Sequence, residues 1–204
     1  MRRWLVVVVT SFLTLCGGSC FGGTSYTSPA VELHVIDQDG DPVSDALVLL
    51  TWKVAGPHDV TIRYLHIFEG RTDSGGRLSV PKWGPEWVTD GVLASDQPHL
   101  RIFKSGYLPI FDQNSPGQAG YRTGPVISVK WSSSPVALMK VSTTTDQYKK
   151  ALRNVALTLK FYVDDQQCLV REAHEMVDEI RAELARVGAD HPYPIWLMPN
   201  RAGC

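Results

Sequence analysis

His174 and Glu175 open a segment that compares with the zinc-binding helix H-E-x-x-H. In that motif two imidazoles one helical turn apart share a metal, and the glutamate polarises a water molecule. Here Asp178 stands in place of the second histidine. Met176 and Val177 continue an apolar stripe, so the segment favours a solvated helix face over a zinc site.

Other histidines lie in segments with strand-like patterns. His66 shares the apolar face of a predicted strand over 60–68, with no second ligand two or four residues away, which predicts a half-buried histidine. An unusual enzyme site around His58, His66 and His99 remains a third alternative. The chain lacks the G-x-S-x-G motif of a nucleophilic serine, and we predict no catalytic residue, no cofactor and no metal ligand.

Three alternating aspartates, Asp37, Asp39 and Asp41, resemble the start of an oxygen-rich calcium loop. The downstream glutamate that completes such a loop is missing, so a plain polar turn is the favoured interpretation. The turn joins apolar runs at 31–35 and 43–50 that repeat with a period of two. This pattern predicts an antiparallel pair of strands that opens a β-sandwich.

Tryptophans are the candidate ligand contacts. Trp83 and Trp87 stand in a predicted connection over 82–96, and Trp131 ends a predicted strand over 126–131. Exposed indole rings stack on sugars or fill hydrophobic grooves, and long loops on rigid scaffolds often carry binding sites. The favoured interpretation, however, is that the first two rings cover an open end of the sandwich.

The rest of the sandwich is predicted from alternating apolar residues between turn residues. Further strands are expected over 46–54, 77–81, 100–104 and 136–141. A loop rich in Gly, Pro and Asn is expected over 112–124, and we predict that it is the most mobile segment.

A helical period replaces the strand period beyond residue 142. Thr144 and Thr145 offer N-caps for a first helix, and Gly188 offers a C-cap for a second one. An apolar stripe on the second helix must be buried against the first helix, the sandwich or another protein, and all three remain open. It consists of Leu169, Ala173, Met176, Val177, Ile180, Leu184 and Val187.

The N-terminal residues 1–21 have the order of an export signal, with Arg2 and Arg3 before an apolar core and small residues after it. The apolar run is about a dozen residues, whereas a membrane-spanning helix needs roughly twenty. Cys20 is a candidate for lipidation, as in bacterial lipoproteins, and plain signal cleavage is the alternative.

Cys168 and Cys204 form a candidate disulfide in an exported chain. A bridge between them would contribute about 3 to 4 kcal/mol in the chain-entropy account. It would hold the C-terminal segment 189–204, which carries three prolines and is expected to form an extended strap. The polar segment 22–30 is expected to be a mobile tether.

Three turn motifs occur in the order of a known family: D-x-D-G-x-P-V-x-x-A-x-V from Asp37 to Val48, a turn from Thr72 to Leu78, and Lys104-Ser105-Gly106-Tyr107. Together they resemble the carboxypeptidase regulatory-like domain and cover roughly 31 to 141. The resemblance implies a small transthyretin-like β-sandwich and says little about function.

Enzymes related to that sandwich differ from this chain. The chain ends in Arg-Ala-Gly-Cys, where hydroxyisourate hydrolase has Tyr-Arg-Gly-Ser. It lacks the closely spaced histidines of intradiol dioxygenases and the zinc-binding domain of metallocarboxypeptidases.

Composition supports one globular domain with an extension. The 204 residues are 44% apolar and 20% charged, with a formal charge of -1, which excludes global disorder and the dense basic face of nucleic-acid binders. We expect a mostly β protein, with a transthyretin-like antiparallel β-sandwich over 31–142 and two helices over 143–188.

The expected role is non-enzymatic binding or scaffolding in the cell envelope, either in the periplasm or at a membrane reached only through a lipid anchor. The helical tail or the Trp83–Trp87 loop would contact a protein partner or an envelope glycan. The alternative is a carbohydrate or peptidoglycan-binding module that uses exposed tryptophans. Oligomeric state and ligand identity stay open.

Overall fold

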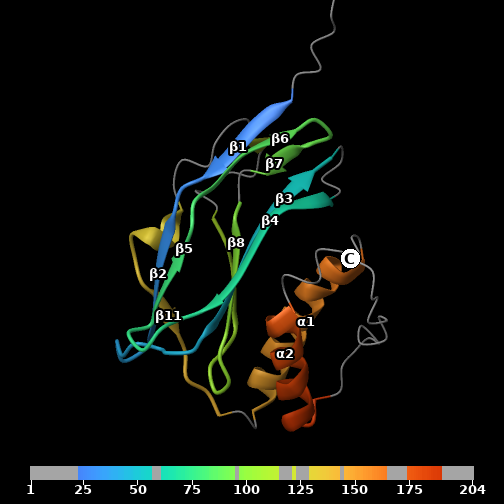
Figure 1. Ribbon diagram of the computed structural model, residues 1–204. Helices are drawn as coiled ribbons and strands as arrows, with labels where there is room; N and C mark the ends of the chain where they lie inside the picture. Colours follow the sequence, from blue (N-terminus) through green and yellow to red (C-terminus); the bar gives the residue numbers. More distant parts are fainter. Residues whose placement is uncertain are drawn as a thin grey trace, which may run out of the picture.

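The computed structural model describes residues 23–56, 61–94, 97–114, 121–122, 129–142, 145–164 and 174–189. Its strands form a sandwich-like arrangement of mainly antiparallel sheets, and two helices lie on the outer side of the larger sheet (Figure 1). The prediction of a mostly β fold with two C-terminal helices is therefore confirmed.

The larger sheet is built on β3 (Leu47–Ala55). Strand β4 (Thr61–Arg71) pairs with β3 along its whole length. On the opposite edge of β3, β8 (His99–Phe103) pairs with the first half and β7 (Val92–Ala94) with the last two residues. Two short strands complete the sheet, β9 (Ile110–Gln113) beside β8 and β10 (Tyr121–Arg122) beside β7.

A smaller sheet faces it. Strand β2 (Val31–Asp37) pairs with β5 (Arg77–Val80) in antiparallel orientation and with β11 (Val136–Leu138) in parallel orientation. A two-stranded ribbon of β1 (Thr24–Ser28) and β6 (Trp83–Val88) stands at one end of the molecule (Figure 1).

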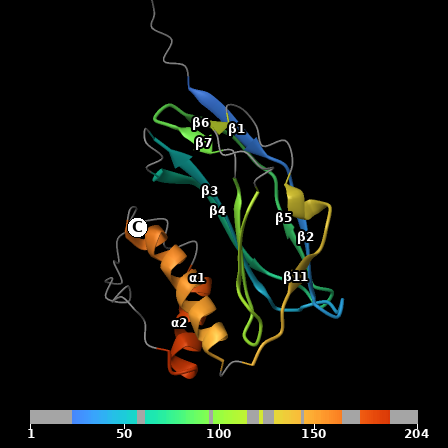
Figure 2. The ribbon, with the colours of Figure 1, turned by 180° about the vertical axis from the view of Figure 1, so that it is seen from behind.

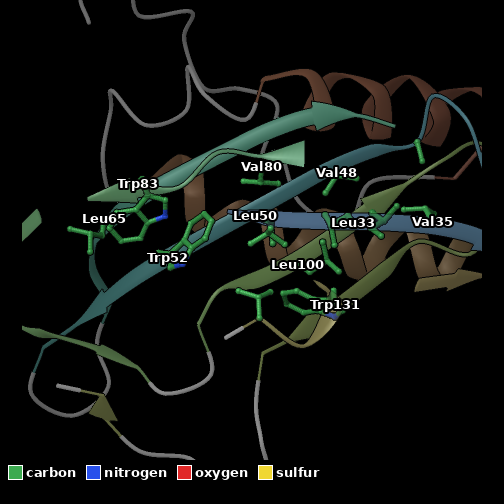
Figure 3. Packing of buried hydrophobic residues seen from close by; sticks show 14 of the residues in the cluster. Leu33, Val35, Val48, Leu50, Trp52, Leu65, Val80, Trp83, Leu100 and Trp131 are labelled. Atoms are coloured by element: carbon green, nitrogen blue, oxygen red, sulfur yellow. The ribbon is translucent and has the colours of Figure 1, made fainter. Parts of the chain in front are cut away.

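The sandwich core lies between these sheets. Side chains at alternate positions of β2 and β3 point into it, as the period of two requires. Figure 3 shows this packing, with Leu33 and Val35 of β2 toward Val48 of β3 and with Trp52 of β3 beside Trp83.

The other face of β3 is buried as well. Leu47 and Leu49 belong to a second apolar cluster, in which they meet α1 (Asp146–Asp164) and α2 (His174–Arg186). Figure 2 shows both helices on the side of the large sheet that is opposite β2 and β5. The described part of the apolar stripe of the second helix, from Met176 to Val187, thus packs against the first helix and the sheet together, while Leu169 and Ala173 lie outside the described residues.

The start of the first helix and the end of the second follow the predicted local signals. Thr145 Oγ1 accepts a hydrogen bond from the Tyr148 backbone N–H at 3.2 Å, as an N-cap does. Gly188 has a positive φ of 61°, and the next N–H, of Ala189, donates to the Leu184 carbonyl at 3.0 Å. This closure of the last carbonyls is the usual C-terminal arrangement of a helix that ends in glycine.

The predicted opening hairpin is wrong beyond its turn. A bridge joins Ile36 to Pro42, but the chain then crosses from the small sheet to the large one at Asp45, which has a φ of 54°. β2 and β3 therefore lie in different sheets. Burial explains why β3 does not pair with β2. Both faces of β3 are apolar and must pack against other elements, and a two-stranded hairpin would bury neither face.

Three other boundaries also differ from expectation. The tether over 22–30 contains β1, and the connection over 82–96 contains β6 and β7. Trp131 lies in a 3-10 turn, η2 (Lys130–Ser132), while most of the strand predicted over 126–131 lies outside the described residues.

Several predictions concern residues that the structure does not describe. These are the signal segment 1–21 with Cys20, the histidine His58, the cysteines Cys168 and Cys204, and the strap beyond residue 189. Of the helices that are described, neither combines the length and the apolar character needed to cross a membrane.

Candidate binding surface

Only one of the three candidate tryptophans offers an open ring. Trp87 is 69% exposed, whereas Trp83 is 9% exposed and Trp131 is 5% exposed. Both buried rings belong to the sandwich core, as the labelled side chains of Figure 3 show. The burial of Trp83 agrees with the favoured prediction of a covering ring, whereas the exposure of Trp87 does not. The carbohydrate-binding alternative, which needs three exposed rings, keeps Trp87 alone of the original set.

Trp87 is held outward by the buried residues of its ribbon. Tyr26 of β1 is fully buried, and its hydroxyl accepts a hydrogen bond from the Leu93 backbone N–H at 3.1 Å. At the start of β6, the Trp83 ring meets the Trp52 ring edge to face, with centroids 5.4 Å apart. The register places Trp87 opposite Ser25 of β1, so the indole stands on a fixed strand.

Trp131 has a different role. Its Nε1 donates to Asp112 Oδ2 at 2.8 Å, and the Lys130 ammonium lies over its ring, 5.3 Å from the centroid. Lys130 Nζ also contacts Asp112 Oδ1 at 2.8 Å. The buried indole therefore holds the Asp112 carboxylate in place. From the sequence, Asp112 was predicted only as the first residue of a loop.

The two described histidines of the third alternative lie on opposite faces of the large sheet. His99 pairs with Thr51 and His66 with Trp52, and successive residues of a strand point to opposite faces. His66 is half-buried, as predicted, with ring centroids 5.4 Å from Trp52 and 5.1 Å from Trp83. The structure thus does not bring His66 and His99 together.

The aspartates of the first turn stabilise the turn itself. Asp37 Oδ1 accepts hydrogen bonds from the backbone N–H groups of Asp39 at 2.9 Å and Asp41 at 3.0 Å. Asp37 also forms an ion pair with Lys140. The hydrogen bond from Lys140 is the main cause that lowers the pKa of Asp37, with the two backbone donors adding to it. This supports the polar turn over the calcium loop.

Carboxylates of the His174 segment bind the sheet. Arg71 of β4 donates to Glu175 Oε1 at 2.7 Å and forms ion pairs with Glu179 and with Asp45. Partial burial alone would lower the pKa of Arg71, but the three carboxylates together raise it. Glu69 accepts hydrogen bonds at the start of α2, including one from the Met176 N–H at 2.8 Å. These contacts dock the helix, and within the described ranges no group of three His, Cys, Asp or Glu side chains could hold a metal ion.

A second polar cluster joins the other end of α2 to the molecule. Glu183 is buried and accepts hydrogen bonds from the Tyr148 hydroxyl at 2.6 Å, the Ser105 hydroxyl at 2.9 Å and Arg186 Nε at 2.6 Å. Tyr148 comes from α1 and Ser105 from the turn after β8. Glu183 therefore links three elements, and its role is structural.

Sequence reasoning missed one exposed aromatic residue. Phe111 of β9 is 42% exposed and lies beside Asp112, Gln113 and Lys130, which line an open hollow with it. The signal was present, since Phe111 and Gln113 alternate with Ile110 and Asp112. That alternation was hidden because 112–124 was assigned to a loop.

Comparisons with known proteins add little. No family model matches the chain, and no curated protein matches it. Among solved structures, 3-chlorocatechol 1,2-dioxygenase from Rhodococcus opacus 1CP is similar over 59% of this chain and 62% of its own, at 16% identity and a TM-score of 0.32. The match spans less than two thirds of the dioxygenase, and at this TM-score it carries no argument about this chain.

Proposed function

We propose that this chain is a non-enzymatic binding or scaffolding protein of the cell envelope. The order of basic, apolar and small residues in 1–21 supports export to the periplasm, and Cys20 offers a site for a lipid anchor. Mass spectrometry of the mature protein tests this step. An N-terminal mass that includes acyl chains supports the anchor, whereas an N-terminal Met1 would contradict export.

The same measurement tests the disulfide between Cys168 and Cys204. Reduction of a bridged protein raises its mass by two hydrogen atoms, because the reductant supplies two electrons and each sulfur gains one proton. An unchanged mass after reduction would show that the two thiols are free.

The exposed ring of Trp87 carries the proposal of a binding surface. The helices bury their apolar stripe in the second cluster, so the contact surface expected on the helical tail is already engaged within the chain. Large exposed aromatic rings are typical anchors of interfaces, because they bury much area for little lost side-chain freedom. Trp87 stands on a ribbon that its buried neighbours hold in place, and this rigidity favours binding.

The test compares two exposed apolar residues. Purified wild-type protein is sedimented with envelope membranes and with purified peptidoglycan sacculi, beside Trp87→Ala and Met139→Ala. Met139 is 55% exposed on another part of the molecule and serves as the matched control. We expect Trp87→Ala to lose most of the sedimented fraction and Met139→Ala to keep it. Equal sedimentation of all three proteins would refute the role of Trp87.

Peptidoglycan or carbohydrate binding is the second candidate, and the open ring of Trp87 favours it. An indole face can stack on a sugar ring. Sedimentation with sacculi but not with membranes, together with quenching of tryptophan fluorescence by soluble glycans in wild type and not in Trp87→Phe, would select it. Sedimentation with membranes alone would select a protein or lipid partner instead.

We also propose that the sandwich belongs to the carboxypeptidase regulatory-like group. Geometry of the shared motifs supports this, because each motif builds a turn. Asp73 Oδ1 accepts hydrogen bonds from the N–H groups of Gly75 at 2.8 Å and Arg77 at 2.9 Å, as Asp37 does in the first turn. Gly76 and Gly106 have φ values of 70° and 86°, which glycine adopts readily. These turn geometries support the proposed fold family.

A further inference from the structure

The Trp87 ring stands on the outer face of the ribbon that β1 and β6 form. Tyr26 and Val88 are buried and mark the inner face, and successive residues of a strand point to opposite faces. Trp87 therefore points outward, together with Ser25, which is its partner in the register. Glu86 stands opposite Tyr26, so by the same alternation its carboxylate belongs to the other face. The exposed ring is thus set apart from the one charged residue of the two strands.

The chain enters the ribbon beside this ring. A Cβ added at Gly23 would lie 3.5 Å from Trp87 Cε3 and 3.0 Å from Thr89 Cγ2. Cys20, the candidate lipid anchor, precedes Gly23 by three residues, and an extended chain of that length spans at most about 11 Å. A lipid attached at Cys20 would therefore keep the Trp87 ring within about 16 Å of the acylated residue.

An anchor this close would bring the ribbon to the bilayer surface. The acylated end of a chain lies where its lipid enters the hydrocarbon core, and the interfacial layer on each side of that core is about 5 to 8 Å thick. The ribbon stands at the end of the molecule away from α2, so this helix does not stand between the ribbon and a membrane (Figures 1 and 2). Tryptophan is enriched in the interfacial layer, because its ring is apolar while its N–H bonds to water or head groups. The reach of the anchor and the chemistry of the ring therefore point to the same layer of lipid.

We propose that the Trp87 ring inserts into the lipid interface beside the Cys20 anchor and fixes the orientation of the sandwich on the membrane. This inference rests on the lipid anchor of the proposed function and names lipid as the partner of the exposed ring. A single anchored residue leaves the domain free to rotate about its tether, whereas a second contact on the rigid ribbon restricts that rotation. Trp87 and its neighbour Ser25 are uncharged, so the contact does not require anionic lipid.

Fluorescence quenching by brominated lipid tests this contact. The mature protein is purified with its native N-terminus, and its mass is checked for acyl chains. It is then reconstituted into phosphatidylcholine vesicles that carry bromine on the acyl chains near the head groups. Bromine quenches an indole that it touches, so we expect wild-type emission to fall on brominated vesicles. In Trp87→Phe the quenched fraction of the emission should be at least about twofold smaller, because the inserted ring is no longer an indole.

Met139→Trp, made in the Trp87→Phe background, is the matched control. Met139 is 55% exposed and follows Leu138, which pairs with Asp37 at the end of β2 away from the ribbon. An indole introduced there should add emission that brominated lipid does not quench. Quenching of this variant as strong as that of wild type would show that the sandwich has no fixed orientation on the membrane, and it overturns the proposal.

Two other results separate this inference from the anchor on which it rests. Equal quenching of wild type and Trp87→Phe, in protein that carries acyl chains, overturns the inference and leaves the anchor in place. If the wild-type protein then also sediments with sacculi and Trp87→Ala does not, the ring binds a glycan instead of lipid. A mature protein without acyl chains overturns the anchor and this inference with it.

Discussion

Replacement of Glu183 by alanine should loosen the docking of both helices. Glu183 is 5% exposed, and its carboxylate accepts the hydroxyl hydrogens of Tyr148 and Ser105. A hydrogen bond to a charged group contributes about 1.5 to 3 kcal/mol, and Tyr148 is fully buried, so its hydroxyl would lose its acceptor. The ion pair with Arg186 is half-exposed on the arginine side and adds about 0.5 kcal/mol. We expect a loss of about 3 kcal/mol in the free energy of unfolding.

Urea unfolding at pH 7, followed by circular dichroism, measures this loss. With a slope of about 2 kcal/mol per molar urea, the midpoint should fall by about 1.5 M. Asp178→Ala is the control on the same helix, because Asp178 is exposed and pairs with exposed Arg181. It should change stability by less than about 0.5 kcal/mol. A Glu183→Ala variant as stable as Asp178→Ala would refute the assignment of Glu183 as the link between the helices and the sandwich.

The pH dependence gives a second readout for Glu183. Burial by itself would raise the pKa of Glu183, but hydrogen bonds from Arg186, Tyr148 and Ser105 together hold it below the ordinary 4.5. A carboxyl group with a lowered pKa stabilises the folded state above its unfolded pKa, and this stabilisation is lost as the pH falls through the folded value. The stability difference between wild type and Glu183→Gln should therefore be full at pH 6 and shrink below pH 4.5. A difference that grows on acidification would contradict this sign.

Three further predictions test the fold by urea unfolding. Gly76→Ala should cost at least about 2 kcal/mol, because the added Cβ would lie 2.3 Å from the Val35 carbonyl oxygen. Gly106→Ala should cost about 1 kcal/mol, because there the positive φ is the sole obstacle. Equal costs of the two substitutions would contradict the close approach at Gly76. Thr145→Ala should lower the free energy of unfolding by about 1 kcal/mol, because it removes the N-cap, and Thr145→Ser should keep the stability of wild type. An alanine variant as stable as wild type would show that the cap is dispensable. Arg71→Met should cost about 1 kcal/mol at low salt and less in 1 M NaCl, because the ion pairs of Arg71 with Glu175 and Glu179 of α2 are partly exposed. A cost independent of salt would point to packing instead.

The crossover at Asp45 shows where sequence reasoning failed for the sheets. The turn at Asp37–Asp41 was predicted from its polar residues and is present, but the partners of the flanking strands were not. A turn is decided by a few neighbouring residues, whereas a strand takes the partner that buries its faces best. The run Leu47–Leu50 is apolar at every position, and such a run is typical of a strand covered on both sides.

Candidate sites were affected in the same way. The sequence shows that Trp83, Trp87 and Trp131 exist, but the exposure of each ring depends on which elements pack on it. Phe111 was overlooked because its ring packs against Arg101 and His99, which come from another strand. The polar tether concealed β1, since only the burial of Tyr26 distinguishes that segment from a flexible linker.

The sequence by itself determined the turns of the three motifs, the start of the first helix, the end of the second helix and the β-rich class of the first two thirds of the chain. These features depend on contacts within about five residues, such as the cap at Thr145 and the positive φ of Gly188. Only the tertiary structure decided that the helices cover the outer face of β3 and that Trp87 alone of the three candidate rings is open. The physical reason is that burial is shared among residues distant in the chain, and no local pattern specifies which of them will meet.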